Sequence, residues 1–145
     1  MYLRTLASLA LLLALPACSY LPSVGSISIS SKAETAASVN EFRATHGLKP
    51  LRSDPNLTRL AAAHAADMAR RNSLDHDGFM ERRGPAGARA ENVAYGCSDV
   101  PCVTKMWINS SGHRANMLRT EVTAYGLASA VAPNGRRYWA LELGE

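Results

Sequence analysis

Residues 122–143 have the sequence VTAYGLASAVAPNGRRYWALEL, and this stretch decides the fold class. Two apolar runs, Val122–Val131 and Arg136–Leu143, lie on either side of a PNG segment at 133–135. Asn-Gly between apolar runs is the strongest short-range signal for a β-hairpin, because both residues accept the positive φ of a tight turn. We therefore predict that the chain closes with an antiparallel hairpin.

The segments before this hairpin have helical patterns. A helix is expected over Lys32–His46, since Gly47 is suited to end it. A second helix should follow an N-cap at Ser53, because apolar side chains then recur at helical spacing. A third is expected over Asp99–Asn109, followed by a short helical turn over Gly112–Arg119. Helices first and an antiparallel hairpin last predict an α+β protein.

Length and composition predict a single soluble domain. The chain has 145 residues, of which 47% are hydrophobic and 19% are charged, and its formal net charge is +4. This composition argues against disorder and against a multi-domain enzyme. The positive excess is small and scattered, so we expect no nucleic-acid partner. We expect the domain to be a monomer.

The first residues, 1–18, have the pattern of an export signal. Arg4 precedes an apolar run of ten residues, Leu6–Leu15, which is too short to cross a bilayer and has the length of a signal-peptide core. The run ends in LPAC, which resembles a bacterial lipobox. We therefore predict lipidation of Cys18 and a membrane-anchored lipoprotein that faces the periplasm or the cell exterior. The alternative is an ordinary secretory signal cut near Ala17.

Residues 19–31 are rich in serine and are predicted to be a flexible linker. Their alternation of Ser and Ile is also compatible with a strand. A folded domain over 32–145 follows the linker. The domain organisation expected from the sequence is therefore a signal peptide, a linker and one folded domain.

Three cysteines are an odd number for an exported protein. If Cys18 carries lipid, Cys97 and Cys102 remain, and they are close enough in sequence to pair. We predict a structural disulfide between them. A two-cysteine metal site is the alternative, but the spacing does not fit a zinc knuckle.

Three polar residues have the chemistry of a functional site: His76, Glu91 and His113. Two imidazoles and a carboxylate are suited to a divalent metal with a bound water, and equally to general acid–base chemistry. In a hydrolase, Glu91 would be the general base acting on that water. Spacing alone does not show that the three side chains meet, because they come from separate elements.

Four stretches of the domain carry recognisable motifs: NEFRATHGLKPL at 40–51, LAAAHAADMA at 60–69, ENVA at 91–94 and WINSSGHRANML at 107–118. They resemble the CAP superfamily, which contains cysteine-rich secretory proteins, antigen 5 and pathogenesis-related proteins. Their order matches over nearly the whole domain, and the stretch at 107–118 is similar to the hallmark of the short bacterial branch of this superfamily.

The resemblance implies an α-β-α sandwich with a central cleft that holds two histidines and two glutamates. His76, Glu91 and His113 match three of these four positions, and Ser110 stands where the second glutamate is expected. The family's histidines bind zinc or another divalent ion, so His76 and His113 are the metal ligands that the resemblance implies, although no cofactor is required. CAP domains have no generally accepted catalytic activity.

The function expected from the sequence is therefore a non-catalytic binder of a small amphipathic or envelope-derived ligand, such as a lipid or a cell-wall component, at this cleft. A metal-dependent hydrolase at the same cleft and an envelope protein-interaction module are the two alternatives. Outside the cleft, His64, Trp107 and Trp139 are expected in the core, while Asn92 and Asn116 should brace loops.

Overall fold

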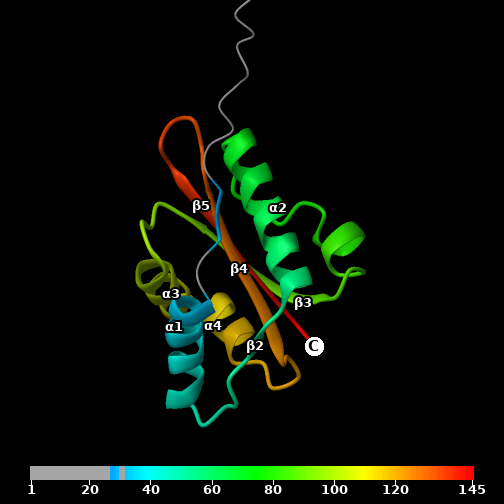
Figure 1. Ribbon diagram of the computed structural model, residues 1–145, viewed down its shortest axis with the longest axis vertical. Coiled ribbons are helices and arrows are strands. Elements are labelled where there is room, and N and C mark those ends of the chain that lie inside the picture. Colours follow the sequence, from blue (N-terminus) through cyan, green and yellow to red (C-terminus); the bar gives the residue numbers. More distant parts are fainter. Residues whose placement is uncertain (1–26, 30–31) are drawn as a thin grey trace, which may run out of the picture.

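The computed structural model of the protein describes residues 27–29 and 32–145 (Figure 1). The predicted signal peptide, the anchor cysteine Cys18 and most of the predicted linker lie outside the described residues. The elements in chain order are β1 (Ile27–Ile29), α1 (Lys32–Thr45), β2 (Arg52–Ser53), α2 (Pro55–Arg71), the short π-helix η1 (Phe79–Arg83), β3 (Ala88–Tyr95), α3 (Val100–Asn109), α4 (Ser111–Met117), β4 (Ala124–Val131) and β5 (Arg137–Gly144).

The sheet has the strand order β1-β4-β5-β3, in which neighbouring strands are antiparallel, and the two residues of β2 pair in parallel with the start of β4. The predicted hairpin is confirmed as β4–β5, and Gly135 in its turn has a φ of +84°. Three residues of the predicted linker, Ile27–Ile29, form β1 and pair with β4. Strand β3 lies at one edge of the sheet, and this edge carries the candidate site.

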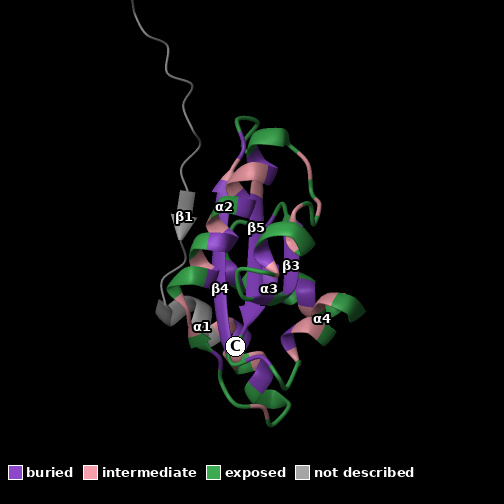
Figure 2. Cartoon of the chain, turned by 90° about the vertical axis from the view of Figure 1, so that its right-hand side faces the viewer, coloured by how far each residue is buried: buried purple, intermediate pink, exposed green. Residues whose placement is uncertain are grey.

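Helices cover both faces of the sheet, as the expected α-β-α sandwich requires. On one face, the alanine-rich side of α2 packs against Val93, Ala128 and Ala140. On the other face, Trp107 of α3 and Met117 of α4 pack in a second cluster that contains both α1 and sheet residues. Figure 2 shows that strands β3, β4 and β5 are largely buried. Trp107 and Trp139, each at most 3% exposed, lie in the core as predicted.

Gly126 explains how closely α2 approaches the sheet. A Cβ atom at this position of β4 would overlap the backbone of Leu57 and Thr58 in the first turn of α2. Any larger residue would push the helix away from the strand. The contact fixes the height of α2 above the sheet, and therefore the position of the polar side chains that lie between them.

Two predictions about local structure were wrong. The N-cap of α2 is Asp54 rather than Ser53, because the Asp54 carboxylate accepts hydrogen bonds from the backbone N–H groups of Asn56 and Leu57, both at 3.0 Å, while Ser53 belongs to β2. Strand β3 was not predicted. Five consecutive residues in it are buried, so both of its faces are covered and the alternating pattern of a half-buried strand is missing.

Candidate functional site

Strand β3 sends neighbouring side chains to opposite faces of the sheet. Val93 packs with α2, whereas Ala90 and Ala94 belong to the cluster on the α3 and α4 side. Because the side-chain period of a strand is two, Glu91 faces the α2 layer and Asn92 faces the α4 layer. The candidate site is therefore built from both layers, at the edge of the sheet.

His76 and Glu91 are in direct contact, as the shared-cleft hypothesis requires. The imidazole of His76, which follows α2, donates from Nδ1 to Oε1 of Glu91 over 2.7 Å. The His76 side chain is 55% exposed, while the carboxylate beneath it is only 2% exposed. With Nδ1 bonded to Glu91, the Nε2 atom of His76 is the ring nitrogen left for a ligand.

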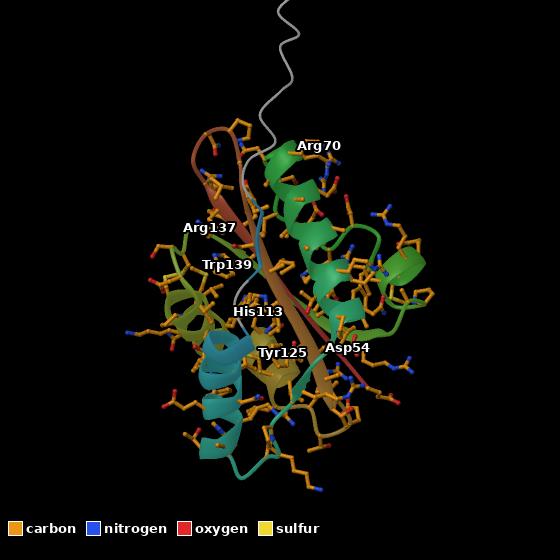
Figure 3. The ribbon with its side chains drawn as sticks, in the orientation of Figure 1. Asp54, Arg70, His113, Tyr125, Arg137 and Trp139 are labelled. Atoms are coloured by element: carbon orange, nitrogen blue, oxygen red, sulfur yellow. A yellow bond between two sulfur atoms is a disulfide. The ribbon has the colours of Figure 1, made fainter. Side chains whose placement is uncertain are left out.

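His113 comes from α4 in the other layer (Figure 3), and two amides hold its segment against β3. Asn92 donates to the backbone carbonyl of His113 over 3.0 Å, and Asn116 donates to the Asn92 side-chain oxygen over 3.0 Å. Asn116 also donates to the Glu91 backbone carbonyl over 3.2 Å. The prediction that Asn92 and Asn116 brace loops is confirmed.

The backbone of His113 is held in place, but no described residue forms a hydrogen bond to its imidazole at Nδ1. Its Nδ1 atom is buried and has no hydrogen-bond partner among the described residues. Burial lowers the pKa of His113, and the charge of the nearby His76 lowers it further. The two imidazoles therefore sense each other electrostatically, and His113 favours the neutral form, whose ring nitrogen is free to bind a ligand.

Arg83 is a site residue that the sequence analysis missed. Its guanidinium is 5% exposed and lies under α2, where Nε donates to Glu91 Oε2 over 2.6 Å and Nη2 donates to Glu91 Oε1 over 2.9 Å. This is a bidentate ion pair, the strongest geometry that an arginine makes with a carboxylate. Arg83 also donates to the backbone carbonyl of Asp77 over 2.8 Å. The loop after α2 is thereby fastened to Glu91.

Glu142 is a second buried carboxyl group in the site, which the sequence analysis also missed. It lies on β5 directly opposite Glu91 in the strand register, and its side chain is completely buried. Arg83 Nε is 3.0 Å from Glu142 Oε1, but its single hydrogen points to Glu91. No donor is therefore aimed at either oxygen of Glu142 within the described chain.

These surroundings keep Glu142 protonated. Burial, the hydrogen bond to Glu91 and the negative charge of Glu91 raise the pKa of Glu142 to about 10. For Glu91, burial alone would raise the pKa, but hydrogen bonds from Glu142 and Arg83 outweigh it and lower the pKa. The buried group therefore consists of a cationic Arg83, an anionic Glu91 and a neutral Glu142. Glu142 keeps its proton and donates a hydrogen bond to Glu91, so the group has no net charge.

His64 completes the buried polar group from the α2 side. Its Nε2 donates to the backbone carbonyl of Asp75 over 2.9 Å and is 3.7 Å from Glu91 Oε1. Burial lowers the pKa of His64, so the imidazole is held neutral. The prediction that His64 is a hydrogen-bonded core histidine is confirmed.

The arrangement limits what Glu91 can do chemically. Both of its oxygens accept hydrogen bonds from Arg83, and Oε1 also accepts one from His76. Within residues 27–29 and 32–145, no group of three or more His, Cys, Asp or Glu side chains is arranged to hold a metal ion. A metal at this site would be held by His76 and His113, with Glu91 as the outer partner that orients His76.

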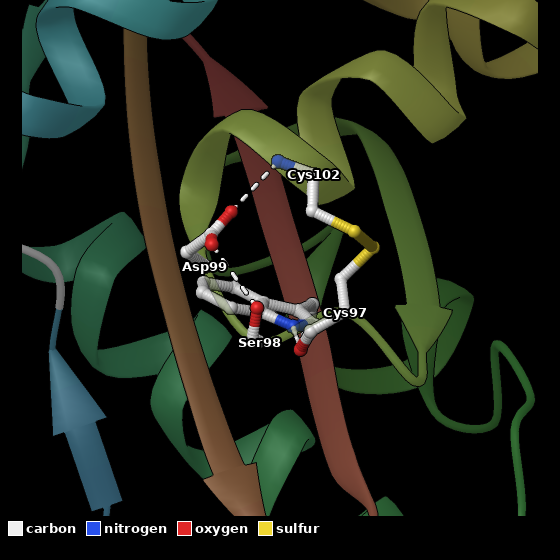
Figure 4. The surroundings of a disulfide bond; sticks show 5 residues. Cys97, Ser98, Asp99 and Cys102 are labelled. Carbon is white, nitrogen blue, oxygen red and sulfur yellow. Dashed lines mark hydrogen bonds between the residues drawn. A yellow bond between two sulfur atoms is a disulfide. The ribbon is translucent and has the colours of Figure 1, made fainter.

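A disulfide joins Cys97 and Cys102 at the start of α3 (Figure 4). Asp99 caps the same helix by accepting a hydrogen bond from the Cys102 backbone N–H over 2.9 Å. Trp139 on β5 donates from its indole to the Cys97 carbonyl over 2.9 Å. The disulfide loop therefore ties the N-terminus of α3 to the end of β3 and to the sheet.

Comparison with known proteins identifies a family for most of the chain. The model of the CAP family, described as the cysteine-rich secretory protein family, matches residues 36–143. An uncharacterized Bacillus subtilis protein, YkwD, is 36% identical over 97 residues, which are 61% of this chain and 38% of that protein. The chain therefore spans well under half of this relative.

Solved structures share the fold. An extracellular Bacillus anthracis protein that contains an SCP domain superposes with a TM-score of 0.65 at 27% identity, over 79% of this chain and 40% of that one. An outer surface protein from Borrelia burgdorferi superposes with a TM-score of 0.65 at 18% identity, over 83% of this chain and 98% of that one. Among the described residues, no helix has the length and apolar character needed to span a membrane.

Proposed function

Since the chain belongs to the CAP family, we propose that it is an exported, membrane-anchored CAP domain that binds a small amphipathic or envelope-derived ligand at the cleft of His76, Glu91 and His113, without catalysis. Export is supported by the extracellular SCP-domain protein among its structural neighbours. The sequence before Cys18 supports attachment to the membrane by a lipid. The proposed location is the periplasm or the cell exterior.

The observation that carries the proposal is the state of Glu91. A general base needs an oxygen free to take a proton from water, within hydrogen-bond reach. Both oxygens of Glu91 are occupied by Arg83, and its pKa is lowered, which makes it a poorer base. The imidazoles of His76 and His113 remain, and imidazole nitrogens are suited to hydrogen-bond a polar headgroup.

An apolar groove supports the amphipathic character of the ligand. It lies between α1 and α3, in the same layer as α4, and has a volume of about 380 Å³. Phe42, Pro101 and Ile108 form its apolar part, Glu41 and Lys105 add charged groups, and the buried Oγ1 of Thr104 has no hydrogen-bond partner among the described residues. The apolar part of this lining is suited to contact an acyl or prenyl chain.

The test is a fluorescence titration with dansyl-labelled undecanoic acid, an amphipathic anion. The protein is the chain from Ser19 onward, which retains every described residue. We expect saturable binding that weakens at least about tenfold in His76→Gln/His113→Gln, because a lost charge-assisted hydrogen bond is worth about 1.5–3 kcal/mol. Arg89→Gln, at an exposed arginine that pairs with Glu145 away from the cleft and the groove, is the control. Equal affinity in all three proteins would refute the cleft as the binding site.

A metal-dependent hydrolase is the second candidate, and the His76–Glu91 hydrogen bond favours it. A carboxylate that accepts from the far nitrogen of an imidazole is the usual outer partner of a metal-bound histidine. A zinc titration by calorimetry on wild type and on His76→Gln/His113→Gln tests this candidate. If wild type binds zinc stoichiometrically, the double variant does not, and a chelator abolishes turnover, the hydrolase becomes the better-supported function.

Glu91→Gln does not separate these two functions. The substitution removes the only anion that neutralises the buried Arg83, and an uncompensated buried charge costs about 3–5 kcal/mol. Loss of activity in this variant would therefore report on folding as much as on catalysis. Substitutions at His76, which is more than half exposed, leave this ion pair intact.

A further inference from the structure

A second polar cavity lies on the α2 side of the sheet, between α2 and the short helix η1 to its right in Figure 1. Its volume is about 520 Å³, which is the size of a small-ligand pocket. Arginine dominates its polar lining, and Asp67 is the single acidic residue in it. The cavity-lining residues are Arg59, Leu60, Ala63, His64, Asp67, Arg70, Arg82, Arg83 and Ala86.

The positive charge of this pocket is not balanced. Arg83 is neutralised by Glu91. Arg70 pairs with Asp67, which also accepts from Arg71 over 2.8 Å, so one carboxylate serves two guanidinium groups. Within the described part of the chain, Arg59 donates only to the neutral side chain of Asn56, over 2.7 Å. The pocket therefore keeps a net positive charge.

Arg82 is exposed and is the arginine of this pocket that has no protein partner among the described residues. Among the described residues, its guanidinium makes no hydrogen bond or ion pair, although its neighbour Arg83 in η1 makes several. The Arg82 side chain lies against Gly78, which directly precedes η1 and has a φ of +75°. A Cβ atom at residue 78 would overlap the Arg82 guanidinium. The fold thus places an unpaired guanidinium at the cavity.

We propose that this pocket binds the phosphate group of a phosphomonoester. Guanidinium groups recognise phosphate through paired N–H donors, and several of them around one cavity favour a dianion over a carboxylate. Arg59, on α2, and Arg82, in η1, supply free donors from the two helices that line the pocket. His64 and Arg83, which also line the pocket, are buried and belong to the polar group around Glu91. Neither His76 nor His113 lines the pocket, so the phosphate would bind outside the proposed cleft.

The first test is calorimetric titration of the full chain, in a nonionic detergent and at mildly alkaline pH, with inorganic phosphate. We expect saturable binding that weakens about tenfold in Arg82→Gln and in Arg59→Gln. Arg89→Gln, an exposed arginine outside the pocket, is the matched control and should change affinity less than about twofold. Absence of saturable binding, or equal losses in Arg82→Gln and Arg89→Gln, would overturn the proposal.

Asp67→Asn gives a test that misfolding cannot imitate. This variant removes the acidic charge from the pocket and frees Arg70, while Arg71 keeps Asp75, to which it donates over 2.8 and 3.1 Å. We expect phosphate to bind several-fold more tightly than to wild type. Unchanged or weaker binding would contradict the proposal, because it would mean that the charge of the pocket does not determine affinity.

Further probes separate the sources of the phosphate group. Dimethyl phosphate, a monoanionic diester, should bind at least about tenfold more weakly than inorganic phosphate, and equal binding would refute the preference for a monoester. Glycerol 3-phosphate and short-chain phosphatidic acid should both bind. Tighter binding of the phosphatidic acid would indicate a lipid headgroup, and tighter binding of glycerol 3-phosphate a soluble metabolite. Arg82→Gln should leave the binding of dansyl-undecanoic acid unchanged.

Discussion

Replacing Glu142 by Gln tests whether the site contains a buried carboxyl group that stays protonated. Glutamine has nearly the same size and offers an N–H donor toward Glu91, but it does not titrate. In the folded wild type, the pKa of Glu142 is raised to about 10, whereas an unfolded glutamate has a value near 4.5. Between these two values, the folded chain holds one proton more than the unfolded chain.

The consequence is a slope in stability against pH. Where the folded state binds the extra proton, the free energy of unfolding falls as pH rises, by about 1.4 kcal/mol per pH unit for one group. Between pH 7 and 9, wild type should therefore lose roughly 3 kcal/mol through Glu142 alone. Glu142→Gln should lack this loss.

Other shifted groups do not interfere in this window. The lowered pKa values of His64 and His113 affect stability below about 6.5, where the unfolded imidazoles become charged. The lowered pKa of Glu91 acts below 4.5, and the raised pKa of Tyr125 acts above 10. The interval from pH 7 to 9 therefore reports on Glu142.

Urea unfolding followed by tryptophan fluorescence at pH 7, 8 and 9 measures the difference. The free energy of unfolding of Glu142→Gln minus that of wild type should grow by roughly 3 kcal/mol across this range. Glu145→Gln, at an exposed glutamate beyond the end of β5, should follow wild type. Parallel pH dependences in wild type and Glu142→Gln would refute a neutral Glu142, and with it the charge assignment of the site.

Four other variants test separate parts of the fold. Asp54→Ala should lower the free energy of unfolding by about 1 kcal/mol in urea melts, because α2 loses its N-cap, and an unchanged midpoint would contradict the cap. Cys97→Ala/Cys102→Ala should lower it by about 2 kcal/mol, the chain-entropy value for so short a loop, and wild-type stability would mean that the disulfide is not formed. Gly126→Ala should lower the melting temperature by several degrees, because the added Cβ atom would meet the α2 backbone. Gly47→Ala is the control: no atom is close to this residue, but its φ is positive, so the substitution should lower the free energy of unfolding only by the backbone strain of about 1 kcal/mol.

Much of the fold followed from local patterns. The hairpin was predicted from Asn-Gly at 134–135, and α3 from Asp99 and Pro101, because turn and cap residues act over a few positions. The predicted N-cap of α2 was one residue too early. Ser53 and Asp54 are both good N-cap residues, and Ser53 is excluded only because it pairs with β4 as part of β2. Strand β3 was missed because burial on both faces hides its period.

Only some of the site residues could be predicted from the sequence. His76 and Glu91 were predicted as partners and are in contact, but Arg83 and Glu142 were not predicted as site residues. Glu142 stands between Leu141 and Leu143 in an apolar strand, and a lone acid in such a run is the signal that indicates a buried carboxyl group. Its partner could not be predicted, because the β3–β5 register that sets Glu91 opposite Glu142 depends on long-range pairing. The resemblance pointed to Ser110 for the lost second glutamate. Ser110 lies between α3 and α4, whereas the second buried carboxyl group, Glu142, comes from β5.

The central claim is that Glu91 is held as an ion-paired anchor, which leaves His76 and His113 to bind a ligand. Carbon-13 NMR of the glutamate side-chain carboxyl groups, titrated over pH, tests this claim most directly. We expect the Glu91 signal to remain that of a carboxylate down to below pH 4.5, and the Glu142 signal to remain that of a carboxylic acid through pH 9. A Glu91 signal that titrates near neutral pH would contradict the account, because such a carboxylate could act as the general base of a hydrolase.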